Sequence, residues 1–386
     1  MKKSRYFDNA STSFPKAPGV AEAVAGYLST EGGSPGRGAY SSAQRAAETA
    51  LAVREKLCRL FGGPDARNVL FTPGCTHALN YVLKGLLAPG DRVVFSGGEH
   101  NAVRRPLNQL KAQGVETACI PCGADGAVDL KAAGRLLTPR TRLLVCSHAS
   151  NVSGTLQPVA ELGAMCRERG ILFCVDAAQT AGARPIDMAA MGIDALAFPA
   201  HKGLLGPQGL GGLIVTGRLA EQLEPLITGG TGGQSELEGM PGELPDRFEA
   251  GTLNLPAIFG LNAALSWAED QGWENLYRRE RKLTGHLIAR LREMEVDGLR
   301  LFGPLDREKQ VGIVSVDFPG MDNAEAALRL EQEYGVQCRC GLHCAPLAHR
   351  ALGTYPQGTV RFSVSVLSSF EDIDYLQAAV CGVMGV

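Results

Sequence analysis

The feature that most constrains the fold is a regular alternation of short apolar runs with longer stretches of helical character between about Asn68 and Thr216. Seven runs have the composition of buried strands: NVLFTP, DRVVFSGG, VETACIPC, TRLLVCSHA, ILFCVDAAQ, DALAFPA and GGLIVTG. Segments between them, such as Gln157 to Gly170, place apolar residues at helical spacing. This alternation predicts an α/β fold with a mostly parallel sheet covered by helices on both faces. Ligands of such sheets bind at the carboxyl ends of the strands.

The chain is too long for one core of ordinary size, so a large and a small domain are expected. A Gly- and Pro-rich passage from Ile227 to Pro256 is too long for a simple connection, which predicts that it is functional or ordered by a partner subunit. Helical stretches follow at Ala257 to Asp270 and Glu274 to Met294, and then the strands VGIVSVDF and TVRFSVSV, each followed by a helix. We expect a large domain over 21–255 and a smaller α+β domain over 256–386.

Charge and hydropathy exclude several classes of partner. The 38 basic and 40 acidic residues leave a formal charge of -2, which gives no general attraction to nucleic acid or to an anionic membrane surface. No stretch approaches the roughly 18 uninterrupted apolar residues of a spanning helix, and no apolar run follows the two lysines at the start. The eleven cysteines lie mainly in apolar runs rather than at framework spacings. We therefore expect a soluble, cytoplasmic protein that acts on a small molecule.

An acid and a lysine stand directly after two of the apolar runs. Asp176 ends FCVDAAQ, and Lys202 follows in FPAHKGLLGPQGLGG. Pyridoxal phosphate requires this pair, because a lysine forms the Schiff base and a carboxylate keeps the ring nitrogen protonated so that the ring accepts electrons. Taken alone, the two residues are more simply read as an ordinary strand-end aspartate and a solvated lysine.

Polar residues at other strand ends point to the same pocket. In FTPGCTHALNYVL a strand, a glycine turn and a helix follow one another, so the amides of Cys75 and Thr76 open a helix N-terminus suited to a phosphate. His100 in SGGEHNAV is placed to lie flat against a planar cofactor. Asn151 and Gln179 are placed to bond polar groups around a ring. Each has a purely structural alternative, but together they describe one pocket.

The segment CRCGLHCAP, from Cys338 to Pro346, crowds three cysteines and a histidine into seven residues. Cys338, Cys340, His343 and Cys344 could supply four soft ligands to zinc, although four ligands so close on one strand and turn are hard to arrange tetrahedrally. A disulfide between Cys340 and Cys344 is disfavoured in a reducing compartment. Cys338 and Cys340 alternate on a strand and should face the same side, whereas Cys344 lies beyond the glycine in a turn.

An ordered set of motifs extends over nearly the whole chain, from about Tyr6 to Leu376: YFDNASTS, FTPGCTHALN, EHNAV, SHASNVSG, VDAAQ, HKGLLGPQGLGG, FEAGTLN, RCGLHCA and VRFSVS. This set resembles the cysteine desulfurases of the class V aminotransferase family, which are fold type I pyridoxal-phosphate enzymes. The short cysteine loop is similar to that of their SUF-type group, group II. The resemblance also implies that residues 1–20 form an N-terminal segment packing near the active site.

The resemblance implies pyridoxal 5'-phosphate as the cofactor and a homodimer as the assembly. Lys202 would form the Schiff base, Asp176 would hold the ring nitrogen and His100 would stack on the ring. Thr252 would contact the phosphate of the other subunit. The implied cofactor-binding set is Cys75, Thr76, His100, Asn151, Asp176, Gln179, His201, Lys202 and Thr252.

The implied substrate-binding residues are Asn151, Arg339 and Arg361, and an arginine suits a carboxylate because its planar fork donates two charge-assisted hydrogen bonds. Two positions depart from the family pattern. Pro199 replaces the serine usual two residues before the histidine of the HK pair, so the phosphate would lose a partner. Either the affinity for the cofactor would be lower or Cys75 would compensate. Cys340 is not the usual residue between Arg339 and the glycine, and it adds a second thiol that could intercept a persulfide.

The implied reaction converts L-cysteine to L-alanine and leaves a persulfide on Cys344, which passes its sulfur to an acceptor protein. Catalysis would rest on Lys202, Cys344 and His100. We expect the neighbouring Arg339 and His343 to favour the Cys344 thiolate. The alternatives are a selenocysteine lyase, another class V reaction such as transamination or epimerisation, and a zinc- or redox-sensing protein on this fold. No metal is expected.

Overall fold

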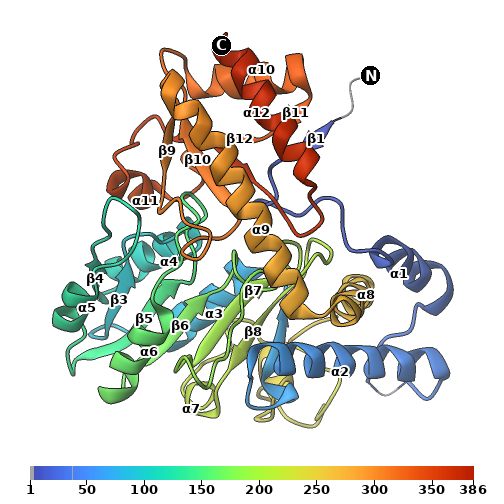
Figure 1. The fold of residues 1–386 in the computed structure, drawn as a ribbon. Coiled ribbons are helices and arrows are strands. Elements are labelled where there is room, and N and C mark those ends of the chain that lie inside the picture. Colours follow the sequence, from blue (N-terminus) through green and yellow to red (C-terminus); the bar gives the residue numbers. More distant parts are fainter. Residues whose placement is uncertain (1–3, 37) are drawn as a thin grey trace.

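The computed structural model describes residues 4–36 and 38–386, so the expectations about Met1 to Lys3 lie outside the described residues. A seven-stranded sheet in the order β2-β8-β7-β6-β5-β3-β4 forms its centre (Figure 1). The strands are β2 (Val69–Thr72), β3 (Arg92–Ser96), β4 (Glu116–Ile120), β5 (Thr141–Ser147), β6 (Leu172–Asp176), β7 (Ala195–Pro199) and β8 (Gly211–Val215). Pairing is parallel from β4 through β3, β5 and β6 to β7, whereas β8 is antiparallel to both β7 and β2. The predicted mostly parallel sheet is confirmed, and each of the seven apolar runs contains one strand.

Successive side chains of the central strands alternate between two apolar cores, as the two-residue period of a strand requires. Val94, Phe173 and Leu196 belong to one core, with residues of α2 (Ser41–Phe61), α5 (Leu130–Leu136), α6 (Val159–Glu168) and α8 (Leu255–Gln271). Val93 and Cys174 belong to the other, with α3 (Cys75–Leu86), α4 (Asn101–Ala112) and α7 (Gly217–Ala220). Helices therefore cover both faces, as predicted.

Helix α2 shows how the local sequence specifies an element. Its buried residues recur at the three- and four-residue spacing of one helix face: Ala43, Ala46, Ala50, Val53, Leu57 and Phe61. Burying a side chain such as Leu57 contributes about 1.5–3 kcal/mol. Gly62, at φ 62°, then ends the helix in the left-handed conformation that glycine adopts without a Cβ clash.

A second, four-stranded antiparallel sheet in the order β12-β13-β10-β9 forms the C-terminal part of the molecule, drawn above the large sheet in Figure 1. Its elements are α9 (Trp273–Arg292), β9 (Arg300–Phe302), β10 (Ile313–Asp317), α10 (Asn323–Tyr334), β11 (Val336–Gln337), β12 (Arg339–Gly341), α11 (Pro346–Ala351), β13 (Thr359–Ser363) and α12 (Phe370–Met384). Residues of α9, α10 and α12 share one apolar core with β10 and β13. Short 3₁₀ turns lie at Ala66–Asn68, Asp246–Phe248 and Glu293–Asp297.

The start of the described chain contacts both sheets. Strand β1 (Arg5–Tyr6) pairs in parallel with β11, and Asp8 forms a bridge to Ser363 at the end of β13. A few residues further, the Ser13 amide donates to the His201 carbonyl at 2.9 Å, beyond the end of β7. Helix α1 (Val20–Gly26) and a π-helical turn at Tyr27–Glu31 then lead to α2.

The Gly- and Pro-rich passage from residue 227, all of it described, has no strand, and its only helical segments are the 3₁₀ turn at Asp246–Phe248 and the first residues of α8. A buried ion pair between Arg54 Nη2 and Glu249 Oε2, at 2.6 Å, fastens it to α2. Ile227 and Leu237 in this passage, and Leu51 on α2, are large exposed apolar side chains. No helix among the described residues has the length and apolar character needed to cross a membrane.

Candidate active site

The carboxyl ends of β2, β3, β5, β6 and β7 surround a cavity of about 280 Å³. The structure brings eight of the nine predicted cofactor residues to its wall: Cys75, Thr76, His100, Asn151, Asp176, Gln179, His201 and Lys202. Thr252 does not line this cavity and instead lines another one, between the Gly- and Pro-rich passage and α2. Within one chain, Thr252 is therefore separated from the other eight.

Asp176, at the end of β6, and Lys202, in the turn after the neighbouring β7, both line the cavity. Burial lowers the pKa of the Lys202 amine, and the nearby Asp176 carboxylate opposes this shift. A lowered pKa increases the neutral, nucleophilic fraction of a lysine. Asp176, 4% exposed at the end of β6, accepts on Oδ1 from the Ala178 amide at 2.9 Å and from Cys75 Sγ at 3.2 Å. The carboxylate is therefore held in a fixed orientation.

Cys75 takes a different place from the one expected. Its side chain does not stand ready to compensate for Pro199 at the phosphate, because its thiol donates to Asp176. Burial, and after it the Asp176 charge, raise the pKa of the Cys75 thiol well above its usual range, so the thiol is a neutral donor. The reason is geometric, since α3 begins at Cys75 and directs this side chain to the end of β6.

The residues around His201 fit an anionic group. Nδ1 of His201 is buried and has no hydrogen-bond partner among the described residues, which is costly unless a ligand supplies one. Burial, and then the charges of Lys202 and Lys16, lower the pKa of His201 to about 4. The N-terminus of α3 opens onto the same cavity, with its unpaired amides. This pairing of an unsatisfied imidazole with a helix N-terminus suits the phosphate of pyridoxal phosphate.

His100 caps the start of α4. Its Nδ1 accepts from the Ala102 amide at 3.0 Å, so the proton of the neutral ring lies on Nε2. Burial is the main cause that lowers the pKa of His100. The preceding Glu99 is fully buried, bonded to Ser96 and Ser147, and burial raises its pKa to about 7.

Two hydrogen bonds hold the cysteine loop against the start of α4 and the turn after β5. The Asn101 amide donates to the Cys344 carbonyl at 2.7 Å, and Asn151 Nδ2 donates to the His343 carbonyl at 2.6 Å. His343 and Cys344 both adopt positive φ, at 48° and 57°. Cys344 is exposed in this turn, next to the residue that follows His100.

His343 does not favour the Cys344 thiolate in the way expected, because its ring carries no positive charge near neutral pH. Burial, and then Arg361, lower the pKa of His343 to about 3, so its ring is neutral at physiological pH. The ring stacks on that of His349, with centroids 5.6 Å apart. The other neighbour expected to favour the Cys344 thiolate is Arg339, and Asp8 Oδ2 lies 3.1 Å from its Nε.

Cys338 and Cys340 face the same side, as predicted, and that side is the apolar core of the C-terminal part. All eleven cysteines, each among the described residues, are free thiols. In the described part of the chain no group of three or more histidine, cysteine, aspartate or glutamate side chains is arranged to hold a metal ion. The crowded segment therefore combines two core thiols with one exposed thiol.

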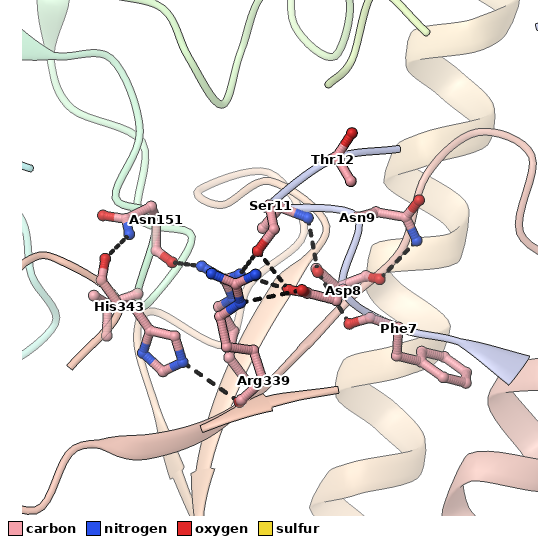
Figure 2. Close-up of polar contacts among 12 residues, drawn as sticks. Phe7, Asp8, Asn9, Ser11, Thr12, Asn151, Arg339 and His343 are labelled. Atoms are coloured by element: carbon pink, nitrogen blue, oxygen red, sulfur yellow. Dashed lines mark hydrogen bonds and ion pairs between the residues drawn. The ribbon is translucent and has the colours of Figure 1, made fainter. Parts of the chain in front are cut away.

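Arg361, on β13, is 2% exposed and anchors a polar network that Figure 2 shows around Asp8, Ser11, Asn151 and Arg339. Arg361 Nη1 donates to the Asn151 carbonyl at 2.9 Å, and Nη2 donates to Asp8 Oδ1 and to Ser11 Oγ, each at 2.8 Å. Neither Asp8 nor Ser11 was predicted as a site residue from the sequence. The only available signal was the motif YFDNASTS itself, because nothing local relates residue 8 to residue 361.

With this geometry in view, the comparison with known proteins identifies the family. The family model described as aminotransferase class V matches residues 5–376. The chain belongs to the class V aminotransferase family. A probable cysteine desulfurase of Methanothermobacter thermautotrophicus is 34% identical, covering 96% of this chain and 92% of the relative. The cysteine desulfurase CsdA of Escherichia coli is 31% identical over 97% of this chain and 92% of its own length.

Solved structures agree. An apo cysteine desulfurase from Thermococcus onnurineus NA1 superposes with a TM-score of 0.91 at 31% identity, covering 99% of this chain and 95% of that chain. A structure of Escherichia coli CsdA gives a TM-score of 0.88 at 30% identity, with the same coverage. The predicted fold type I architecture is confirmed.

Proposed function

We propose that this protein is a pyridoxal-phosphate-dependent cysteine desulfurase that converts L-cysteine to L-alanine and carries the sulfur as a persulfide on Cys344. The observation that carries the proposal is the convergence of Lys202 and Asp176 in one cavity, with the Cys344 loop bonded to the residue after His100. The names of the curated relatives support it.

The residues present divide the work of holding the cofactor. His201 and the N-terminus of α3 would hold the phosphate, and Asp176 would keep the ring nitrogen protonated. When bound, pyridoxal phosphate supplies an electron sink for the charge that develops on the substrate Cα. Lys202 would hold the cofactor covalently and, once released, would take the Cα proton.

The substrate carboxylate would bind Arg361, with Asn151 beside it. The Cys344 thiolate would then attack the substrate sulfur, so that the new S–S bond forms as the substrate C–S bond breaks. The remaining three-carbon fragment takes up one proton at Cβ and regains at Cα the proton that Lys202 removed, and it leaves as alanine. The exposed turn suits this task, because the same thiol must then present its persulfide to a second protein.

The test is one turnover with L-cysteine, followed by alanine analysis and mass spectrometry of the peptide that contains Cys344. The wild-type protein should absorb visible light with pyridoxal phosphate, and Lys202→Ala should lose that band. Cys344→Ser should keep the band but form neither alanine nor persulfide, whereas Cys338→Ser, a matched thiol of the same segment, should form both.

A wild-type protein that stays colourless with pyridoxal phosphate would refute the cofactor. Sulfur added to Cys340 in an active Cys344→Ser variant would show a different nucleophile. Arg361 and Asn151 would bind the carboxylate, which L-cysteine and L-selenocysteine share, so these residues do not discriminate between the two substrates. A parallel assay with L-selenocysteine therefore shows whether the selenocysteine lyase reaction is preferred.

We further propose a SUF-type enzyme that works as a cytoplasmic homodimer and transfers its sulfur to an acceptor protein. The short cysteine loop supports the SUF-type assignment. Thr252 lines a different cavity from Lys202 within one chain, which supports the dimer. In a dimer, Thr252 would complete the Lys202 cavity of the other subunit. The exposed Leu51 and Ile227 would be covered by such an interface.

A further inference from the structure

The guanidinium of Arg361 is already occupied in this structure. Both Nη2 hydrogens are used, one by Asp8 Oδ1 and one by Ser11 Oγ, each at 2.8 Å. Nη1 donates to the Asn151 carbonyl at 2.9 Å. Nε is buried and has no partner among the described residues, so this side chain has unused donor capacity in a closed environment.

The shape of a guanidinium decides what an incoming carboxylate must displace. Its planar fork offers a carboxylate two bidentate edges, Nη1 with Nη2 and Nη2 with Nε. Both edges use Nη2. A substrate carboxylate can therefore bind Arg361 through two hydrogen bonds only if Asp8 or Ser11 releases Nη2.

The Asp8 carboxylate also contacts a second arginine, Arg339, to which it remains bound if it leaves Arg361. Its Oδ2 lies 3.1 Å from Arg339 Nε, and the Arg339 side chain is 51% exposed (Figure 2). The backbone of Asp8 is held by its bridge to Ser363 and by the Ser11 amide, which donates to the Asp8 carbonyl at 3.0 Å. Only the carboxylate needs to move, by rotation of its own side chain.

We propose that Asp8 occupies the carboxylate position on Arg361 in the substrate-free protein and moves to Arg339 when an α-carboxylate binds. This inference rests on the proposed function, which assigns Arg361 to the substrate carboxylate. Asp8 is then a specificity-determining residue. A ligand without a carboxylate cannot replace Asp8 on Arg361. Arg339, Arg361 and Asp8 together have a formal charge of plus one, which one ligand carboxylate neutralises.

A purely structural role for Asp8 makes the opposite prediction. If Asp8 only orients Arg361, removing its charge should weaken the binding of a carboxylate ligand. If Asp8 competes, removing its charge should strengthen that binding. Asp8→Asn separates the two, because asparagine keeps the volume and one acceptor oxygen but loses the charge.

The experiment measures binding of L-alanine and L-alaninamide to the pyridoxal-phosphate-loaded protein by calorimetry, with thermal unfolding to check the fold. Asp8→Asn should bind L-alanine about tenfold more tightly, since a hydrogen bond to a charged partner no longer has to be displaced, and should bind L-alaninamide unchanged. Ser11→Ala, which frees the other Nη2 hydrogen without a change of charge, should have a smaller effect. Equal or weaker L-alanine binding by a folded Asp8→Asn variant overturns the proposal.

A second variant keeps the proposal testable if Asp8→Asn does not fold. Arg339→Gln removes the place to which Asp8 moves, so L-alanine affinity should fall while L-alaninamide affinity does not. In the double variant Asp8→Asn/Arg339→Gln that loss should disappear, and its persistence would show that Arg339 binds the ligand directly. Failure of the wild-type protein to bind L-alanine at all would count against the proposed function, whereas wild-type binding with no gain in Asp8→Asn counts against this inference alone.

Discussion

Asp176 is the proposed partner of the cofactor ring nitrogen, and a thiol and a backbone amide hold one of its two oxygens. Cys75 Sγ and the Ala178 amide both donate to Oδ1. These two hydrogen bonds to Oδ1 also fix the direction in which Asp176 Oδ2 points. A thiol is a weak donor, and burial keeps this one neutral, so that its proton stays available to the carboxylate.

Cys75→Ala should therefore lower the turnover number about fivefold, which corresponds to the roughly 1 kcal/mol net value of one hydrogen bond. Cys75→Ser keeps a donor at the same position and should recover most of the loss. The measurement is alanine formation at saturating L-cysteine, with cofactor content fixed by absorbance. Equal activities for the alanine and serine variants would show that the contact to Asp176 has no role in turnover.

At the scale of elements, the position of Cys344 depends on how closely β12 approaches the loop before β13. Gly358 has φ 79°, and a Cβ there would overlap the backbone of Gly341, the last residue of β12. Gly341 pairs with Thr359, and the turn that carries Cys344 begins just after it. A side chain at residue 358 must therefore displace this turn.

Gly358→Ala should reduce persulfide formation on Cys344 at least tenfold and leave the visible band of the cofactor unchanged, since the Lys202 cavity is not touched. Gly353→Ala is the matched control, because Gly353 has a similar φ of 73° but no atom of the described residues within 4 Å of its Cβ position. In both variants an alanine adopts the left-handed conformation, which costs about 1 kcal/mol or more. A difference in persulfide formation between the two variants therefore measures the effect of the clash with Gly341 alone. If both lose persulfide equally, backbone strain rather than strand spacing explains the effect.

The same elements show what the sequence could and could not predict. Periodicity predicted each strand of the large sheet and the shared side of Cys338 and Cys340, because both depend on neighbours a few residues away. The neutral state of His343 could not be predicted, since it follows from burial and from Arg361, which is distant in sequence. The Asp8–Arg361 contact spans 353 positions, and only the folded chain reveals it.

At the scale of the whole molecule, burial is the first cause that lowers the pKa of five of the histidines, His100 among them, and for four of these five the lowered pKa has a value well below neutral pH. The pKa is lowered to about 4 for His148, His201 and His349 and to about 3 for His343. In the unfolded chain these rings would titrate near 6.5. Between pH 6.5 and about 4 the unfolded state binds more protons, so the folded state loses stability as the pH falls. Glu99, with its pKa raised to about 7, acts in the opposite direction and offsets one of the four.

Urea unfolding of the cofactor-free protein should therefore show a free energy of unfolding that decreases from about pH 6.5 to about pH 4.5. His349 is fully buried, so His349→Asn should reduce the slope by up to about 1.4 kcal/mol per pH unit. His77→Asn, at an exposed histidine, is the control and should leave the slope unchanged. A wild-type stability that is flat over this range would contradict the neutral state of the buried rings.

The last prediction concerns the assembly, because the placement of Thr252 can be tested by mixing subunits. If Thr252 contacts the phosphate across a dimer, Lys202→Ala and Thr252→Ala chains complement each other: one site of the hybrid takes its lysine from one chain and its threonine from the other. Mixing equal amounts of the two variants after mild dissociation, at limiting pyridoxal phosphate, should restore persulfide formation to about a quarter of the wild-type level, because about half of the dimers are hybrids and each hybrid has one complete site of two. If Thr252 acts within its own chain, every chain in the mixture that keeps Lys202 carries the Thr252→Ala substitution, and no mixing ratio restores activity above that of the Thr252→Ala variant alone. The contact is worth roughly 1.5–3 kcal/mol as a hydrogen bond to a charged group, so the difference between the two outcomes is at least about tenfold in cofactor affinity.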